Sequence, residues 1–298
     1  MRSKRPSQIV LIVLTVLNAS LLSSCSSSSI QSVRKESLYA RVIRTGKIRC
    51  AYAVYPPLCI KDPTTKKLSG IGIEALEIVA KKLGIKAEYV EEVGGETLIE
   101  GLTAGRYDLF AIPIWTTANR AKSIDFSEPL FFNPLFIYAR PDDKRFTGHI
   151  ERINSKDITI ATVDGGTAQL IADTDFPKAR QLSLPELSDF AQDLLNISTR
   201  KADVTFAEPA LVERYLRTNP GSVENADPAR PIRLFPNCWA FNRGESEFKA
   251  MLDTVLDEVI NSGTMDKIIS KYEAAPHLYY RVALPYQGPR SANLSNQL

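Results

Sequence analysis

The sequence is poor in the residues that metal-dependent and nucleophilic enzymes use. Its 298 residues include two histidines and four cysteines, and none of them shows the close ligand spacing typical of a zinc site. Neither His149 nor His277 lies near a Gly-x-Ser-x-Gly turn, which argues against a Ser/His/Asp hydrolase. We therefore predict no metal ion, no cofactor and no catalytic residue.

The chain also lacks an excess of charge once its N-terminal segment is set aside. It contains 37 basic and 34 acidic residues, and residues 1–24 hold three basic residues and no acidic ones. Without that segment the basic residues number 34, equal to the acidic ones, so no basic stripe remains for a nucleic acid. The 44% hydrophobic content is that of a globular protein.

No long apolar run is present, but a short one lies near the N-terminus. Residues 9–17 are apolar, follow three basic residues and are too few to span a bilayer, which is typical of an export signal. Leu22-Ser23-Ser24-Cys25 resembles a lipobox, so we predict a lipoprotein signal peptide over residues 1–24 and acyl chains on Cys25. A secretory signal cleaved nearby, without lipid, is the alternative. Residues 25–40 then form a flexible tether.

Three cysteines remain if Cys25 carries lipid, an odd number for an oxidising compartment. They are Cys50, Cys59 and Cys238, and the first two flank the Tyr55-Pro56-Pro57 turn. We expect three buried thiols, with a Cys50–Cys59 disulfide as the alternative.

Strand-like and helix-like patterns alternate along most of the chain, which predicts parallel sheets covered by helices. The expected strands are residues 47–54, 87–90, 107–112, 135–139, 158–163, 203–206 and 232–235. The expected helices are 73–83, 98–102, one from 167, 188–197, 209–216 and a long one through 248–259, which Gly263 ends before Thr264 caps the next.

The strongest candidate binding residue follows one of these strands. The run 107–112 predicts a buried strand that ends at Pro113, and Thr117 is a good cap for a helix from Ala118. Arg120 would then lie in the first helical turn, at the sheet edge where open α/β proteins hold ligands. Its guanidinium and the first-turn N–H groups suit a carboxylate. An exposed helix arginine without a ligand is the alternative.

This segment resembles part of the family 3 extracellular solute-binding proteins, the polar amino acid receptors of bacterial ABC importers. The matching motifs are Gly105-Arg106-Tyr107-Asp108, Thr117-Ala-Asn-Arg120 and Ile124-Asp125-Phe126-Ser127-Glu-Pro129. Tyr55-Pro56-Pro57, Gly70-Ile-Gly-Ile-Glu74 and Asn261-Ser-Gly-Thr-Met-Asp-Lys267 resemble further family motifs. The resemblance covers about residues 41–272.

The resemblance implies an α/β periplasmic-binding-protein fold of type II, with two lobes and a two-stranded hinge. Lobe 1 would comprise residues 41–138 and 240–272, and lobe 2 residues 139–239. The tail, 273–298, falls outside the resemblance.

Two motifs of the second lobe complete the expected site. Asp164-Gly165-Gly166-Thr167 follows a strand and opens a helix, so its amides could hold an anion. It resembles the family turn whose threonine touches the ligand carboxylate, a position that Thr167 takes with Gly166 and Asp164 beside it. An ordinary turn between strand and helix is the alternative.

Glu208 ends a stretch, Asp203-Val-Thr-Phe-Ala-Glu208, that resembles the family motif whose last acid pairs with the ligand's α-amino group. A carboxylate across a cleft from Arg120 suits a zwitterion, since either charge buried alone is costly. A helix cap before Pro209 is the alternative role for Glu208.

The chain departs from the family pattern at two places in the site. Pro113-Ile114-Trp115 stands where relatives have hydroxyl-bearing residues, and Gly94-Gly95 where they often place an aromatic residue that stacks on the ligand. Trp115 either supplies that aromatic face or belongs to the core, in which case Tyr55 is the next candidate. These departures leave the solute's identity open.

Together these features predict a lipid-anchored, monomeric substrate-binding protein in the periplasm or at the cell surface. It would capture an amino acid or similar small polar solute and present it to an ABC permease, without chemistry. Two alternatives remain open. One is an enzyme similar to cyclohexadienyl dehydratase, with Glu208 as general acid, and the other is a sensory or partner-docking lipoprotein.

Overall fold

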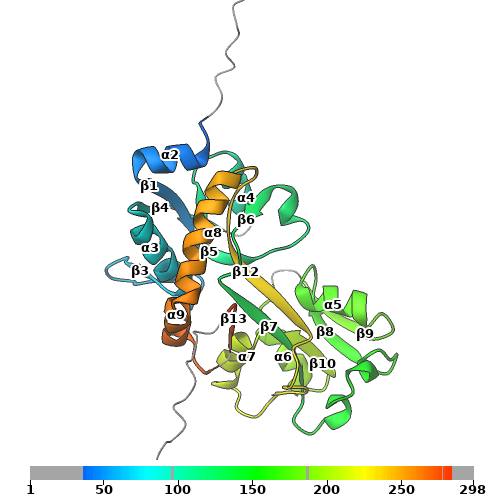
Figure 1. Ribbon diagram of the computed structural model, residues 1–298. Coiled ribbons are helices and arrows are strands. Elements are labelled where there is room, and N and C mark those ends of the chain that lie inside the picture. The colour runs from blue at the N-terminus through cyan, green and yellow to red at the C-terminus, as the bar shows by residue number, and fades with distance from the viewer. Residues whose placement is uncertain (1–35, 95–96, 186–187, 277, 284–298) are drawn as a thin grey trace, which may run out of the picture. The chain divides into compact units, whose positions relative to one another are not determined.

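Two long strands connect two halves of one sheet, as the ribbon in Figure 1 shows. The structure, a computed structural model, describes residues 36–94, 97–185, 188–276 and 278–283. The predicted signal peptide, Cys25 and most of the predicted tether lie outside these ranges. The described residues from Ser37 onward belong to one compact unit.

The helices and strands of the described residues have the following bounds. The α-helices are α2 (Leu38–Thr45), α3 (Ile71–Leu83), α4 (Leu98–Thr103), α5 (Thr167–Asp175), α6 (Ala191–Ser198), α7 (Pro209–Leu216), α8 (Ser246–Asn261) and α9 (Thr264–Tyr272). The strands are β1 (Lys47–Tyr52), β2 (Ile60–Lys61), β3 (Leu68–Ser69), β4 (Lys86–Glu92), β5 (Leu109–Trp115), β6 (Ile124–Phe126), β7 (Phe131–Ala139), β8 (Thr159–Val163), β9 (Arg180–Leu184), β10 (Val204–Ala207), β11 (Glu224–Asn225), β12 (Arg233–Asn242) and β13 (Tyr280–Arg281). Short 3₁₀ turns cover Arg120–Lys122, Lys144–Phe146 and Ile150–Ile153.

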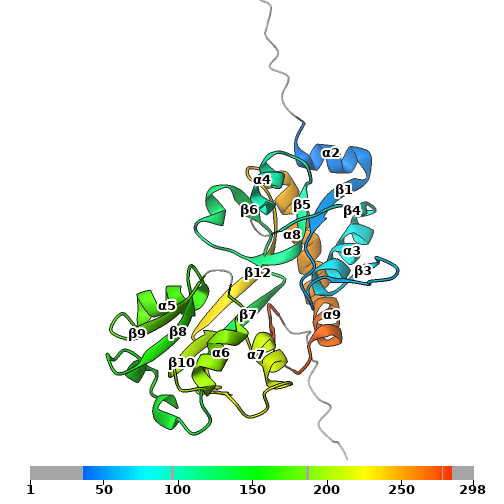
Figure 2. The ribbon, with the colours of Figure 1, turned by 180° about the vertical axis from the view of Figure 1, so that it is seen from behind.

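The sheet runs in the order β4-β1-β5-β12-β7-β10-β8-β9. β1 is parallel to β4 and β5, and β8 is parallel to β9 and β10, so each half contains the predicted parallel pairs. β7 and β12, here called the joining strands, are antiparallel to each other and to their outer neighbours. The chain leaves the first half along β7 and returns along β12 (Figure 2).

Apolar burial follows the same division. One core cluster draws its members from Leu38 to Phe131 and again from Trp239 to Tyr279, with α3, α8 and α9 packed on the first half of the sheet. Two further clusters lie between Leu135 and Phe235 and cover the strands of the second half. The joining strands contribute to both sides, so they link two separately buried cores.

Gly70 fixes the loop that carries Tyr55. Its φ of +115° is one that other residues rarely adopt, and a Cβ there would lie 2.6 Å from the carbonyl oxygen of Leu58. The next two amides, of Ile71 and Gly72, donate to the carbonyl oxygens of Pro57 and Leu58 at 3.0 Å. The start of α3 therefore holds the 55–58 turn in place.

Two strands continue through prolines at which the sequence predicts an end. β5 passes Pro113 and reaches Trp115, and β12 passes Pro236 and reaches Asn242. The register between these strands shifts between Cys238 and Ala240, close to the place where Pro113 lacks an N–H donor. This irregularity in the pairing accommodates Pro113 within β5. The predictions that strands end at Pro113 and before Pro236 are therefore wrong.

Three predicted helix boundaries also differ. The helix expected from Ala118 is a single 3₁₀ turn, Arg120–Lys122, and Thr264 is the first residue of α9 rather than its cap, which is Gly263. Residues 38–40, predicted as part of the tether, belong to α2, which begins at Leu38 with the Ser37 side chain as its cap. α7, Pro209–Leu216, agrees with its prediction.

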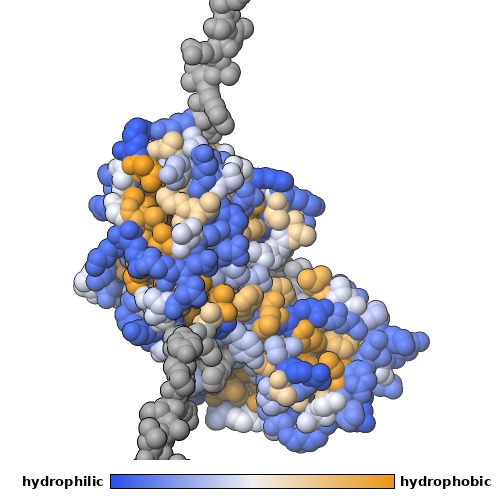
Figure 3. Space-filling model, in the orientation of Figure 1, coloured by the Kyte–Doolittle hydropathy of each residue, from blue (hydrophilic) through white to orange (hydrophobic). Residues whose placement is uncertain are grey.

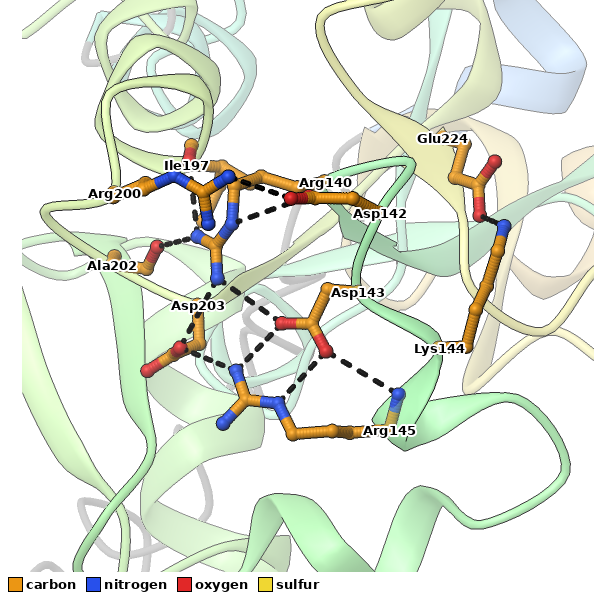
Figure 4. Close-up of polar contacts among 10 residues, drawn as sticks. All are labelled: Arg140, Asp142, Asp143, Lys144, Arg145, Ile197, Arg200, Ala202, Asp203 and Glu224. Atoms are coloured by element: carbon orange, nitrogen blue, oxygen red, sulfur yellow. Dashed lines mark hydrogen bonds and ion pairs between the residues drawn. The ribbon is translucent and has the colours of Figure 1, made fainter.

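An ion-pair network follows the end of β7 and is drawn in Figure 4. Arg140 is buried and donates to the carbonyl oxygens of Ile197 and Ala202, and it pairs with Asp143 and Asp203. Arg145 pairs with the same two acids. This network ties the end of β7 to α6 and the start of β10.

Hydrophilic residues cover much of the face seen in Figure 3, and apolar residues appear on it in separate patches. Among the described residues, none of the helices is both long and apolar enough to cross a membrane.

Candidate functional site

Four of the predicted site residues line one cavity beside the joining strands. The cavity has a volume of about 380 Å³ and is bordered by Tyr55, Trp115, Arg120 and Glu208. Asn133 of β7 and Asn237 of β12 also line it. The remaining wall is apolar and consists of Ala53, Leu58, Leu98, Phe110, Ile112, Pro113 and Ile114.

Arg120 brings a positive charge into this cavity without a balancing acid. Its Nη1 donates to the carbonyl oxygen of Trp115 at 2.7 Å. Burial lowers the pKa of the guanidinium, which stays charged because its ordinary pKa is far above neutrality. None of the ion pairs between described residues includes Arg120. The side chain therefore has unused donors for an anion.

Glu208 brings the opposite charge. It precedes α7 but its side chain makes no capping hydrogen bond, so it does not act as the helix cap that the sequence left open. It is partly accessible, yet the surrounding protein removes enough water that burial raises its pKa to about 7. A hydrogen bond from Asn133 Nδ2 opposes this shift. Within the described part of the chain, Glu208 has no cationic partner in an ion pair.

The sequence did not single out Asn133 or Asn237. Asn133 is 5% exposed, and its Oδ1 is buried with no hydrogen-bond partner in the described residues. Asn237 is 1% exposed and donates from Nδ2 to the carbonyl oxygen of Phe235 at 3.2 Å. The position of Asn133 as a polar residue within the apolar run from Phe131 to Ala139 is the sequence feature that could have indicated its role.

Tyr55 and Trp115 give the cavity its aromatic surface. Tyr55 is 47% exposed, yet the surrounding protein removes enough water that burial, followed by the negative charge of Glu208, raises its pKa to about 12, so the phenol is neutral at physiological pH. Trp115 stacks on Phe235 with ring centroids 4.4 Å apart and an angle of 13° between planes. Trp115 thus borders the cavity and also packs against the core of the second half.

The other predicted site residues do not line this cavity. Thr117 is exposed and its Oγ1 accepts a hydrogen bond from the Arg120 amide at 3.3 Å. In the Gly-Gly-Thr turn, the Gly165 amide donates to Gln169 Oε1 at 2.8 Å and the Gly166 amide to the Val163 carbonyl oxygen at 2.9 Å. Two of the turn's amides are therefore already occupied.

Asp164 and Thr167 flank these glycines at the two ends of the turn. Asp164 accepts a hydrogen bond from Ser183, and Thr167 is the first residue of α5. In this structure the whole turn, including Gly166, lies outside the cavity that Arg120 and Glu208 line.

A larger cavity of about 680 Å³ lies elsewhere, between α9 and the C-terminal segment. Its arginine, Arg281, is already paired with Glu273 and Asp266. Because Arg281 is paired in this way, the cavity offers a solute no unpaired arginine. It also contains none of the residues that the sequence predicts for the site.

The cysteines outside the signal region are Cys50, Cys59 and Cys238, and all three are buried free thiols, as expected. Burial raises the pKa of Cys59 to about 11, which leaves little thiolate for reaction at neutral pH. The described residues contain no cluster of histidine, cysteine and acidic side chains that could hold a metal ion.

Comparison with known proteins identifies the family. The model for bacterial extracellular solute-binding proteins, family 3, matches residues 48–275. The chain belongs to this family. It is 22% identical over 276 residues to the L-cystine-binding protein TcyA of Bacillus subtilis, an alignment that covers 88% of this chain and 96% of that protein. It is also 25% identical over 214 residues to a probable amino-acid ABC transporter-binding protein of Haemophilus influenzae, covering 72% and 79% of the two chains.

Solved structures confirm the two-lobed type II fold. The L-cystine solute receptor of Neisseria gonorrhoeae, in an unliganded open conformation, aligns with a TM-score of 0.61 and 26% identity over 80% of this chain and 97% of that one. An ancestral amino acid-binding protein described as a precursor of cyclohexadienyl dehydratase aligns with a TM-score of 0.59 and 23% identity, covering 80% and 99% of the two chains.

Proposed function

We propose that this family 3 protein is the substrate-binding component of an ABC importer and that it holds a small zwitterion, an amino acid or similar solute. One observation carries the proposal. Arg120 and Glu208, two opposite charges without ion-pair partners among the described residues, line one cavity whose wall is otherwise largely apolar. A ligand carboxylate would bind Arg120 and a ligand ammonium would bind Glu208, so that each buried charge is compensated.

Two relatives support an amino acid as the solute. One is named for binding L-cystine, and the other is described as a probable amino-acid ABC transporter-binding protein. The departures at Trp115 and Gly94 leave open which side chain the pocket prefers.

Closure of the two lobes would complete the site. In this proposal lobe 1 comprises residues 41–138 and 240–272, lobe 2 comprises 139–239, and β7 and β12 bend between them. The turn with Asp164, Gly166 and Thr167 would then approach the ligand carboxylate, with Thr117 on the facing lobe. Ligand binding stabilises the closed state because only that state makes contacts from both lobes.

Export and membrane attachment form the remaining part of the proposal. Residues 1–24 would direct export, and acyl chains on Cys25 would hold the monomer at a membrane near its permease partner. The N-terminal sequence supports this part of the proposal.

A thermal-shift screen tests the binding function. The full chain, purified in detergent, is heated with each standard amino acid, with diamines and with dicarboxylates. We expect at least one zwitterion to raise the unfolding temperature in a saturable manner. If none of these solutes changes it, the pocket does not serve solute capture, and the sensory or partner-docking alternative is favoured.

A second function is favoured by the protonation of Glu208. Because burial raises the pKa of Glu208 to about 7, this carboxyl group is protonated in a large share of the molecules at neutral pH, as a general acid requires. An enzyme similar to cyclohexadienyl dehydratase would use that proton to release the hydroxyl group of prephenate or arogenate as water while carbon dioxide leaves. Turnover of either compound by the wild type, lost in Glu208→Gln, would support this function. Absence of turnover would remove it.

A further inference from the structure

The C-terminal segment, which extends past the end of the family match at residue 275, packs back onto a joining strand. Its strand β13 pairs antiparallel with β7, with Tyr280 opposite Phe132 and Arg281 opposite Phe131 (Figure 1). Arg281 binds both carboxylate oxygens of Glu273, at 2.6 and 2.9 Å. The segment is therefore fixed both to α9 and to β7.

This docking places Tyr279 beside the proposed ligand site. Tyr279 is 4% exposed, and its ring meets Phe131 edge-on, with centroids 5.2 Å apart at an angle of 74°. Tyr279 lines a smaller cavity together with Tyr55, Asn133 and Glu208. This cavity has a volume of about 270 Å³ and is here called the second cavity. The last three residues also line the cavity that contains Arg120. Glu208 thus lies where the two cavities meet.

Both phenols are within electrostatic reach of this carboxyl group. After burial, the negative charge of Glu208 is the largest cause of the raised pKa of Tyr55 and of Tyr279. Neither hydroxyl has a hydrogen bond to another group in the described part of the structure. Two neutral aromatic rings and one carboxyl group therefore share this space.

We propose that Tyr279 is a specificity-determining residue of the solute site, and that Tyr279, Tyr55 and Glu208 form a subsite for an organic cation. Aromatic faces attract ammonium groups, most strongly where water is excluded, and Glu208 supplies the countercharge. This inference rests on the proposed solute-binding function and extends it, because it selects solutes whose cationic end is an ammonium or methylated ammonium group.

The charged residues on α7 and directly after it do not cancel this preference. Arg214 and Arg217 also line the second cavity, but both are exposed, so solvent screens their charges. Glu213 lies on the same wall and offsets part of their charge. The desolvated group of the subsite is the Glu208 carboxyl group, whose charge is screened by less water.

Tetramethylammonium chloride is the probe, because it carries the cation and lacks the carboxylate that Arg120 would hold. Calorimetric titrations use the full chain in detergent and the variants Tyr279→Leu, Tyr279→Phe and Tyr280→Leu. Tyr280 is the matched control, since it directly follows Tyr279 in the chain, at the start of β13, but does not line this cavity. We expect Tyr279→Leu to weaken binding roughly five- to thirtyfold, and Tyr279→Phe and Tyr280→Leu to stay within about twofold of the wild type.

Tyr55→Leu is a second test that does not depend on the buried tail, and the subsite predicts a similar loss. Lack of saturable tetramethylammonium binding in the wild type, or equal binding in Tyr279→Leu and Tyr55→Leu, would overturn the inference. If the cation subsite is wrong but the protein still captures a zwitterion, an amino acid binds and tetramethylammonium does not. If the subsite is right but the protein captures no zwitterion, tetramethylammonium binds and no amino acid does. In that case Arg120→Ala leaves the binding of tetramethylammonium unchanged.

Discussion

Asn133, on joining strand β7, donates a hydrogen bond from Nδ2 to the carboxylate of Glu208, the residue that precedes α7. Burial favours the protonated form of Glu208, whereas this hydrogen bond favours the charged form. The balance leaves the pKa at about 7. A residue of the strand that links the two cores thus helps to set the charge of the proposed ligand site.

The affinity for a zwitterion should therefore depend on pH. An ammonium group prefers ionised Glu208, so binding should strengthen as pH rises through about 7, while Tyr55 and Tyr279 stay neutral and Arg120 stays charged. Asn133→Leu removes the bond that favours the charged form, so the midpoint of this rise should move to higher pH. Calorimetry between about pH 5.5 and 8.5 measures it. In Glu208→Gln the rise should disappear, and a rise that persists there would assign the titration to another group.

Trp115 should report ligand binding by its fluorescence. Its indole borders the cavity, whereas Trp239 is fully buried and donates from Nε1 to the Ala111 carbonyl oxygen at 3.0 Å. We expect Trp115→Phe to abolish most of the ligand-induced change and to reduce affinity only modestly, because a ring remains. The Trp239→Phe variant should retain the signal. If the signal follows Trp239 instead, Trp115 serves the core and Tyr55 supplies the aromatic wall.

The Arg140 network should matter for folding rather than for binding. Arg140→Ala leaves Arg145 as the cation that still pairs with Asp143 and Asp203 in the network of Figure 4, so we expect a loss of about 3 kcal/mol in the free energy of unfolding. Urea denaturation measures it. Arg200→Ala, which breaks an exposed pair with Asp142, is the control and should cost about 1 kcal/mol or less. Equal losses in the two variants would contradict the role given to Arg140.

Membrane attachment should depend on the sulfur of Cys25. Cys25→Ser removes the proposed lipid acceptor and keeps the basic and apolar parts of the export signal. We expect the variant to be exported at least in part and to lose its processed, membrane-associated form. Cell fractionation with metabolic labelling by a fatty acid measures both. A processed wild-type protein that is soluble and unlabelled would rule out the anchor.

The sequence predicted the α/β class from local patterns, and the family resemblance implied the two lobes and several residues of the cavity. The alternation of apolar runs and amphipathic helices requires no tertiary information, and the motif around Arg120 follows a strand that is itself visible as an apolar run. Glu208 and Tyr55 were also proposed from short motifs, and the structure brings both into the cavity with Arg120.

Other features depend on contacts that no local pattern encodes. In the sequence, Asn133 is a polar residue within an apolar strand, and no local pattern explains it. Its hydrogen-bond partner, Glu208, lies 75 residues away in the chain. Tyr279 lies outside the family match, and its place beside Glu208 follows from the pairing of β13 with β7. The sequence predicts strand ends at Pro113 and Pro236, because the register shift that accommodates Pro113 arises only between paired strands.

The affinity of Arg120→Ala for the zwitterion that the thermal-shift screen identifies tests whether Arg120 holds the ligand. If the guanidinium holds the ligand carboxylate through two charge-assisted hydrogen bonds, its removal should weaken binding by about 3–6 kcal/mol, measured by calorimetry. Arg106→Ala is the matched control, since Arg106 is an exposed partner of Glu91 outside the cavity, and it should bind like the wild type. If the dissociation constant of Arg120→Ala equals that of the wild type, Arg120 does not bind the ligand.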